Sequence, residues 1–221
     1  MHRHLAAFLF ACLCASPALA ASLAERLQSS APDANPAVIT LAVQALQCAT
    51  ANGSAAPEKL AVIDYSLPSS QRRLWVFDIG SGALLFHELV AHGRNSGEDA
   101  TTHFSNTPDS RATSFGLFRT EGTYKGSNGY SLRLAGLESG VNDKAMERAI
   151  VMHGAPYVNE EVVQKLGRLG RSWGCPAVRA GIAVQMIDTL KGGQLLFSYY
   201  PDKAWLASSR FLNCPAQTAS R

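Results

Sequence analysis

The chain reads Leu74-Trp-Val-Phe-Asp-Ile-Gly80-Ser-Gly82-Ala-Leu84-Leu-Phe-His-Glu-Leu-Val-Ala91 in its first half. Two short apolar and aromatic runs flank a Gly-Ser-Gly turn, which is typical of two antiparallel strands joined by a tight hairpin. Similar runs, divided by Gly, Ser and Asn, recur along the chain and predict a mainly β fold. The predicted strands are Ala61–Tyr65, Leu74–Ile79, Leu84–Ala91, Ser114–Thr120, Tyr130–Leu134, Ala149–Met152 and Gln194–Tyr199.

Helical patterns precede and interrupt these strands. Asn35 followed by Pro36 is typical of a helix cap and a first-turn proline, and Asn52-Gly53 provides a stop, so a helix is expected over Pro36–Ala49. The other predicted helices are Ser22–Gln28, Asn142–Arg148, Asn159–Leu166 and Gly181–Leu190. The fold class is therefore mainly β, with several short helices and an N-terminal helix.

Composition limits the kind of protein this is. With 221 residues, 47% hydrophobic and 17% charged, the chain fits one globular domain and is neither disordered nor membrane-embedded. A formal net charge of +3 without charge runs gives no reason to expect a nucleic-acid partner.

The first twenty residues resemble a targeting segment. A basic start is followed by eleven apolar residues, Leu5–Ala15, and by a small-residue pattern that ends at Ala20. We predict a signal peptide over 1–20, a helical segment over 21–58, a β-rich domain over 59–200 and a tail over 201–221. The mature protein is then exported to the periplasm or cell envelope without an integral membrane segment. Lipidation at Cys12 is a disfavoured alternative because Phe10 fits that signal poorly.

Signal cleavage leaves three cysteines: Cys48, Cys175 and Cys214. An odd number in an oxidising compartment leaves one thiol over. A bridge between Cys48 and Cys214 would join the N-terminal helix to the tail and leave Cys175 free. Three unpaired buried cysteines are the alternative, and the sequence alone does not decide the pairing.

Cys175 lies in a Gly-rich stretch that follows a strand-end His153-Gly154. A cysteine is nucleophilic as the thiolate, so it needs a base or a cation nearby. His153 is the candidate base, and Arg168 and Arg171 are expected to lower the pKa of the thiol. A zinc site formed by Cys175 with His153, His92 or His103 is disfavoured because no pair has zinc-ligand spacing.

The residues beside Cys175 suggest an oxyanion site. Gly174 allows the backbone to approach a bound carbonyl, so the amides of Gly174 and Cys175 are expected to face a developing oxyanion. Pro176 has no N–H and favours an extended Cys175.

His153-Gly154 followed by Ser172-Trp173-Gly174-Cys175 resembles the active-site signature of the murein L,D-transpeptidases, His-Gly and then Ser/Thr-x-Gly-Cys. The resemblance extends from about Trp75 to Tyr199 and points to a divergent branch of the YkuD-type L,D-transpeptidases. Trp173 replaces the usual second His, Ala177 replaces the usual Arg or Asn, and the gap between His153 and Cys175 is longer. Donor and acceptor preferences therefore do not transfer.

The resemblance implies a β-sandwich-like catalytic domain that acts on peptidoglycan stem peptides. Cys175 would form a thioester with a tetrapeptide donor and pass it to an amine acceptor, with His153 moving the proton and the Gly154 carbonyl orienting the imidazole. Ser172 would shape the loop. Residues in the similar stretches would contact the peptide: Arg171, Trp173, Arg94, Asn106, Tyr130 and Arg133.

Other functions stay open at this stage. Water in place of the amine would make the protein an L,D-carboxypeptidase or endopeptidase. A non-catalytic wall-binding domain would hold Cys175 in a disulfide. A papain-like peptidase is disfavoured because its nucleophile precedes the His in the chain. We expect no metal or organic cofactor and a monomer.

Overall fold

The computed structural model describes residues 21–53 and 55–214, so the predicted signal segment lies outside the described residues. No helix in these two ranges is long and apolar enough to cross a membrane. The helices are α1 (Leu23–Ser30), α2 (Pro36–Ala51), α3 (Glu160–Leu166), α4 (Ala180–Leu190) and α5 (Lys203–Ser208). The strands are β1 (Lys59–Asp64), β2 (Leu74–Asp78), β3 (Leu84–Glu88), β4 (Val90–Ala91), β5 (Gly116–Gly126), β6 (Gly129–Gly136), β7 (Val151–Ala155), β8 (Ala177–Arg179) and β9 (Leu195–Tyr199).

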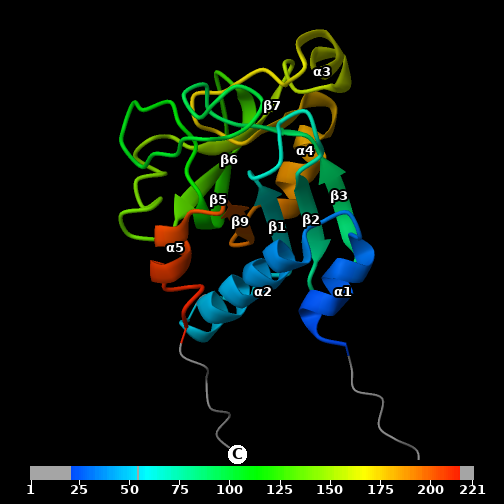
Figure 1. Cartoon of the computed structure of the whole chain (residues 1–221), viewed down its shortest axis with the longest axis vertical. Helices are drawn as coiled ribbons and strands as arrows, with labels where there is room; N and C mark the ends of the chain where they lie inside the picture. Colours follow the sequence, from blue (N-terminus) through cyan, green and yellow to red (C-terminus); the bar gives the residue numbers. More distant parts are fainter. Residues whose placement is uncertain (1–20, 54, 215–221) are drawn as a thin grey trace, which may run out of the picture.

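The strands form one mixed sheet in the order β3-β2-β1-β9-β5-β6-β7-β8-β4. Its parallel pairs are β1 with β9 and β7 with β8, and the remaining pairs are antiparallel. β3 and β4 lie at opposite edges of the sheet although only Leu89 separates them in the chain. The sheet must therefore curl until its edges approach each other, which gives it a nearly closed, barrel-like shape (Figure 1). The predicted mainly β fold with short helices and an N-terminal helix is confirmed.

The central strands are buried on both faces. Along β1, Leu60 and Val62 enter one hydrophobic core while Ala61 and Ile63 enter a second, because successive side chains of a strand point to opposite faces. This explains why the central strands have continuous apolar runs and not a polar–apolar alternation.

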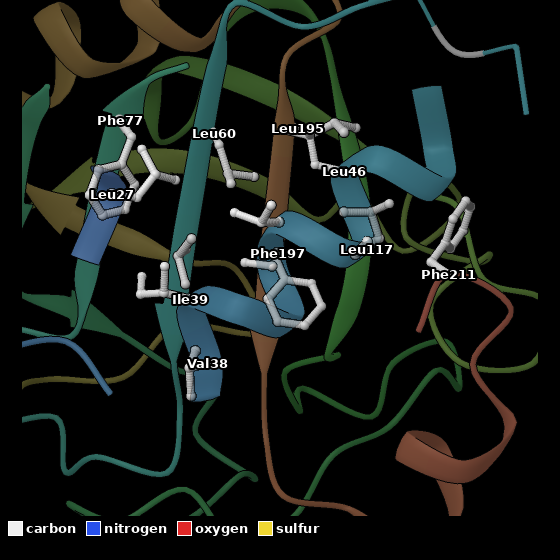
Figure 2. Close-up of a cluster of buried hydrophobic side chains, with 14 of the residues drawn as sticks. Leu27, Val38, Ile39, Leu46, Leu60, Phe77, Leu117, Leu195, Phe197 and Phe211 are labelled. Carbon is white, nitrogen blue, oxygen red and sulfur yellow. The ribbon is translucent and has the colours of Figure 1, made fainter. Parts of the chain in front are cut away.

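The first core lies between the sheet and the N-terminal helices. Leu27 of α1 and Val38, Ile39 and Leu46 of α2 pack with side chains of the central strands (Figure 2). Figure 1 shows both helices at the end of the molecule opposite α3. Asn35 caps α2 by accepting the Ala37 amide at 3.0 Å, and Pro36 occupies its first turn, as the sequence predicted.

The second core lies inside the curl of the sheet. Side chains of β1 and β2 meet those of β6 and β7 there, together with Met186 and Ile187 of α4. Two halves of one sheet thus cover a common core, which is the sandwich-like feature of the fold. Helix α4 also contacts β7 and β8 directly, and so supports the two strands that flank the candidate nucleophile Cys175. The stretch 167–176, which carries Cys175, is called the nucleophile loop.

Four segments differ from the sequence-based predictions. The predicted strand Leu84–Ala91 is two strands, because its first part pairs with β2 and its last two residues pair with β8. The predicted helix Asn142–Arg148 is wrong: this segment is a series of turns. The Asn142 amide donates to the carbonyls of Phe115 and Leu117, which fixes the segment to β5 and competes with helix formation. Strand β8 and helix α5 are short and were not predicted.

A disulfide joins Cys48 of α2 to Cys214 of the C-terminal segment, the pairing expected from the sequence. The Gln44 side-chain amide donates to the Leu212 carbonyl beside it. Phe211 and Leu212 are buried against α2 and extend the first core. The bridge closes a loop of 166 residues and ties helix α2 to the C-terminal end of the described chain.

A buried polar network fixes residues 90–92, which are hydrogen-bonded to the loop that carries Cys175. The guanidinium of Arg73, fully buried, donates to the Val90 and Leu67 carbonyls and lies 2.8 Å from Nδ1 of the fully buried His92. The His92 carbonyl accepts the Ser172 amide at 3.0 Å. The network therefore connects the interior of the sheet with the loop that carries Cys175.

Removal of the disulfide is expected to destabilise the protein. The loop that it closes is long, so the Cys48→Ser, Cys214→Ser double variant should lose about 2–5 kcal/mol of unfolding free energy. Urea unfolding measures this loss. Reducing agent should lower the stability of the wild type to that of the variant and leave the variant unchanged. Equal stability of the oxidised wild type and the variant would contradict this role.

His92 is expected to make the protein sensitive to acid. Burial first, and then the charge of Arg73, lower the pKa of His92 from 6.5 to about 4. Between pH 6.5 and about pH 4 the unfolded state therefore binds more protons than the folded state. The contribution of neutral His92 to the unfolding free energy is complete above pH 6.5 and is lost as the pH falls toward 4. The loss is about 2–3 kcal/mol by pH 4.5.

Urea unfolding at pH 7 and pH 4.5 tests this account. The unfolding free energy that is lost between pH 7 and pH 4.5 should be smaller in His92→Gln than in the wild type, by about 2–3 kcal/mol. The matched variant His103→Gln changes an exposed histidine and should keep the wild-type pH dependence. The same pH dependence in His92→Gln and the wild type would refute the assignment to His92.

Candidate active site

His153 and Cys175 reach one cavity because β7 and β8 are parallel neighbours. His153 pairs with Ala177, so the segment just before β8 runs beside the start of β7. Both side chains line a cavity of about 350 Å³. Its other lining residues are Ser127, Asn128, Tyr157, Arg171, Ser172 and Trp173.

The His153 imidazole is oriented by its own strand. Nδ1 lies 2.9 Å from the Gly154 carbonyl oxygen, as the resemblance implied. A carbonyl can only accept, so Nδ1 carries the proton and the lone pair of the neutral ring is on Nε2. Burial lowers the pKa of His153, and the hydrogen bond to Gly154 opposes this effect. The residue is therefore set up as a neutral base at pH 7.

Cys175 is a free cysteine and only 8% exposed. Its thiol donates to the Ala149 carbonyl, with an Sγ–O distance of 3.7 Å, and among the described residues it has no hydrogen bond to His153. Burial raises the pKa of the thiol, while a hydrogen bond from the Val151 amide and the charge of Arg148 lower it. Burial outweighs the groups that favour the anion, so the pKa of the resting thiol lies above its ordinary value.

Ser172 shapes the nucleophile loop. Its hydroxyl donates to the Cys175 carbonyl at 2.7 Å and accepts the Gly174 amide at 3.1 Å. The Gly174 amide is thus already used, which differs from the expectation that it faces an oxyanion. Because Pro176 has no N–H, the Cys175 amide is the remaining donor in this part of the loop.

Gly174 has a packing role instead. Its φ is +122°, and a Cβ there would lie 2.8 Å from the Ala112 carbonyl oxygen. The left-handed backbone and this close contact both require glycine. The nucleophile loop therefore packs tightly against the segment that contains Ala112.

The arginines near the nucleophile differ from the prediction. Arg168 and Arg171 both pair with Glu98, at 2.9 and 2.6 Å, and neither contributes to the lowering of the pKa of Cys175. Arg148 does contribute, and sequence analysis missed it because it lies in a segment with a false helical pattern. No spacing or motif in the sequence marks this residue.

Of the six candidate peptide contacts, the structure brings Arg171 and Trp173 to the cavity. Trp173 is 68% exposed, and the Arg111 guanidinium lies 4.5 Å from the centre of its ring. Sequence analysis did not identify Ser127, Asn128 and Tyr157. The first two form the tip of the β5–β6 hairpin, for which the Gly126-Ser-Asn-Gly129 turn was the available signal.

The other four candidates do not line this cavity. Arg94 is exposed, and its backbone amide donates to the Ser172 carbonyl. Asn106 binds Asp143, and the Tyr130 hydroxyl donates to Asp188 of α4. The Arg133 guanidinium lies 4.2 Å from the ring centre of Tyr124, in a separate cavity of about 240 Å³ that Ala149 and Val151 also line.

Residues 21–53 and 55–214 contain no group of three or more His, Cys, Asp or Glu side chains arranged to hold a metal ion. The chemistry that the described cavity itself offers is nucleophilic attack by a thiol assisted by a neutral imidazole.

Similar solved structures have low sequence identity to this chain. An L,D-transpeptidase from Mycobacterium smegmatis is 15% identical over 65% of this chain and 59% of that chain, with a TM-score of 0.40. An L,D-transpeptidase from Stackebrandtia nassauensis is 15% identical over 79% of this chain and 75% of that chain, with a TM-score of 0.39. A fused Zn-dependent amidase/peptidase/peptidoglycan-binding domain-containing protein from Clostridium acetobutylicum is 18% identical over 75% of this chain and 62% of that chain, with a TM-score of 0.39.

This chain spans 59% and 58% of the length of the first two similar structures. A comparison with curated proteins gives no match. The model of the L,D-transpeptidase catalytic domain family matches residues 30–199, which is more than half of the chain. The chain therefore belongs to the L,D-transpeptidase catalytic domain family.

Proposed function

We propose that the protein is a peptidoglycan L,D-transpeptidase in which Cys175 forms a thioester with a tetrapeptide stem and passes it to an amine acceptor. One observation carries the proposal: a free cysteine and a histidine with an available Nε2 line the same cavity. Membership of the family supports the substrate class.

The first half-reaction uses the neutral pair. Nε2 of His153 takes the thiol proton while Sγ of Cys175 bonds to the carbonyl carbon at the L-centre of diaminopimelate. The tetrahedral intermediate then collapses, the C–N bond to D-alanine breaks, and His153 returns the proton to the leaving amine. A thioester remains on Cys175.

The second half-reaction reverses these transfers. The amine of another stem peptide gives a proton to Nε2 of His153 and attacks the thioester carbon. The C–S bond breaks, an amide forms, and the sulfur recovers its proton. The Gly154 carbonyl keeps the imidazole in one orientation through both steps, which is the role that a carboxylate has in other triads.

Oxyanion stabilisation falls to the Cys175 amide in this proposal. The Gly174 amide donates to Ser172, so the pair of donors expected from the sequence is reduced to one in this loop. Ser172 and Gly174 then act on the geometry of the loop.

We propose Arg171 and Trp173 as peptide contacts because they line the cavity. Arg133 is proposed to contact a more distant part of the stem, since its cavity shares Ala149 with the site of Cys175. The resemblance alone supports a role in peptide binding for three further residues, because none of them lines the cavity of Cys175. These residues are Asn106, Tyr130 and Arg94.

We further propose that the protein works outside the cytoplasm, in the periplasm or cell envelope, after removal of residues 1–20. The Cys48–Cys214 bridge supports this location because structural disulfides persist in oxidising compartments. Residues 59–200 would form the catalytic unit, with 21–58 as a helical segment and 201–221 as a tail.

Activity on purified muropeptides tests the proposed function. Incubation with a disaccharide-tetrapeptide should release D-alanine and yield cross-linked dimers, measured by liquid chromatography and mass spectrometry. Cys175→Ala should form no thioester, and His153→Ala should lose about 10²–10⁴ in rate, because a positioned base contributes that much.

The exposed His103 provides the matched control, and His103→Ala should retain wild-type turnover. Thermal unfolding should show that all variants are folded. D-alanine release without dimers would instead identify an L,D-carboxypeptidase, and cleavage of existing cross-links an endopeptidase. Turnover retained by folded Cys175→Ala would exclude this mechanism.

The pH dependence of Cys175 alkylation should reflect its burial. Because burial raises the pKa of the thiol above its ordinary value of 9.0, the thiolate fraction and the rate should rise with pH through a midpoint above that value. Iodoacetamide labelling followed by intact-mass measurement gives the profile. A midpoint below pH 7 would mean that a thiolate–imidazolium pair is already formed in the resting protein, contrary to this account.

A further inference from the structure

Arg148 is the strongest unassigned polar feature beside the nucleophile. Its guanidinium donates to the Ser105 and Ala112 carbonyls and to the Ser114 and Ser110 hydroxyls. The four acceptors belong to one connecting segment, residues 105–114, that enters β5. A half-buried arginine with so many internal partners holds that segment in one conformation.

The same guanidinium lies against the nucleophile loop. A Cβ at Gly174 would be 3.4 Å from Nη2 of Arg148 and 2.8 Å from the Ala112 carbonyl oxygen that Arg148 binds. The hydroxyl of Thr113 donates to the Gly174 carbonyl at 3.3 Å. Arg148, residues 105–114 and Gly174 therefore form one packed unit beside Cys175.

Arg148 is also connected to the sulfur through the backbone. The next residue, Ala149, has a φ of +50° and accepts the Cys175 thiol. A non-glycine residue rarely adopts this left-handed conformation, so the surrounding contacts must impose it. The anchored side chain of Arg148 fixes the chain just before Ala149 and so helps to aim this carbonyl at the sulfur.

Among the ionisable side chains around Cys175, Arg148 is the one whose charge lowers the pKa of the thiol. Tyr65 and Tyr157 stay neutral because burial raises the pKa of each to about 12. His153 is neutral, and Arg171 shares the Glu98 carboxylate with Arg168 and does not contribute to the pKa shift of Cys175. Arg148 has no carboxylate partner among the described residues, so its charge acts on the sulfur without a neighbouring anion to cancel it.

We propose that Arg148 is a positioning residue for Cys175: its guanidinium fixes residues 105–114 against the nucleophile loop and stabilises the sulfur anion during acyl transfer. It does not contact the peptide, because four of its five N–H groups are used within the protein. The role of Arg148 during acyl transfer rests on the proposed function. Its effect on the pKa of the Cys175 thiol does not depend on that function.

Alkylation of Cys175 by iodoacetamide across pH tests the inference without any peptidoglycan. Arg148→Gln should raise the midpoint by about one pH unit relative to the wild type, because an opposite charge near a thiolate lowers its pKa by at least that much. Arg148→Lys should restore most of the wild-type midpoint. The matched variant Arg119→Gln removes an exposed arginine paired with Glu121 and should leave the midpoint unchanged.

A second variant covers the case in which Arg148→Gln does not fold. The Ser110→Ala, Ser114→Ala double variant keeps the charge but removes two of its anchors, so the midpoint should move upward by a smaller amount. A wild-type midpoint in either folded variant would overturn the proposal. A shifted midpoint in a protein without muropeptide turnover would support the role of Arg148 and reject the proposed function, so the two outcomes are distinguishable.

Discussion

The parallel pairing of β7 with β8 is the constraint on which the site depends. This pairing sets His153 opposite Ala177. It thereby brings Cys175, two residues before Ala177, to the same cavity as the imidazole. A parallel pair needs a long crossover, and here the crossover contains α3 and the nucleophile loop itself. Helix α4 then packs on both strands. The proposed site is therefore positioned by the core of the protein and not by a surface loop alone.

Burial determines the charge state of this pair. It raises the pKa of Cys175 and lowers the pKa of His153, so both shifts favour the neutral forms. A neutral thiol beside a neutral imidazole does not react until a proton moves, which ties nucleophile activation to substrate attack. The same burial gives the hydrogen bond of the imidazole and the charge of Arg148 more influence than they would have in water. Desolvation thus disfavours the thiolate of Cys175 and strengthens the interactions that the proposed mechanism uses.

The sequence was most informative where local patterns have a direct physical meaning. Asn35-Pro36 predicted the start of α2, and the apolar runs predicted most strands of the sheet. The odd cysteine count led to the disulfide and to the free Cys175. The helix start and the strands can be predicted from neighbouring residues in the chain, and the free cysteine from the number of cysteines. None of these predictions needs information on tertiary contacts.

Tertiary contacts decide the features that the sequence did not reveal. Leu84–Ala91 divides because its two ends pair with opposite edges of a curled sheet, which no local pattern encodes. Asn142–Arg148 is not helical because Asn142 binds β5. Arg168 and Arg171 pair with Glu98, about seventy residues earlier in the chain, while Arg148, whose charge lowers the pKa of Cys175, lies in a segment without a motif. Gly174 was recognised as important, but its amide serves Ser172.

The protonation of His153 tests the central claim most directly, because the mechanism needs an imidazole with Nδ1 bound to the Gly154 carbonyl and Nε2 free to accept a proton. Nitrogen-15 chemical shifts of the His153 ring in the substrate-free protein at pH 7 report this state. The account predicts a single neutral tautomer with the proton on Nδ1. An imidazolium, or a proton on Nε2, would contradict it.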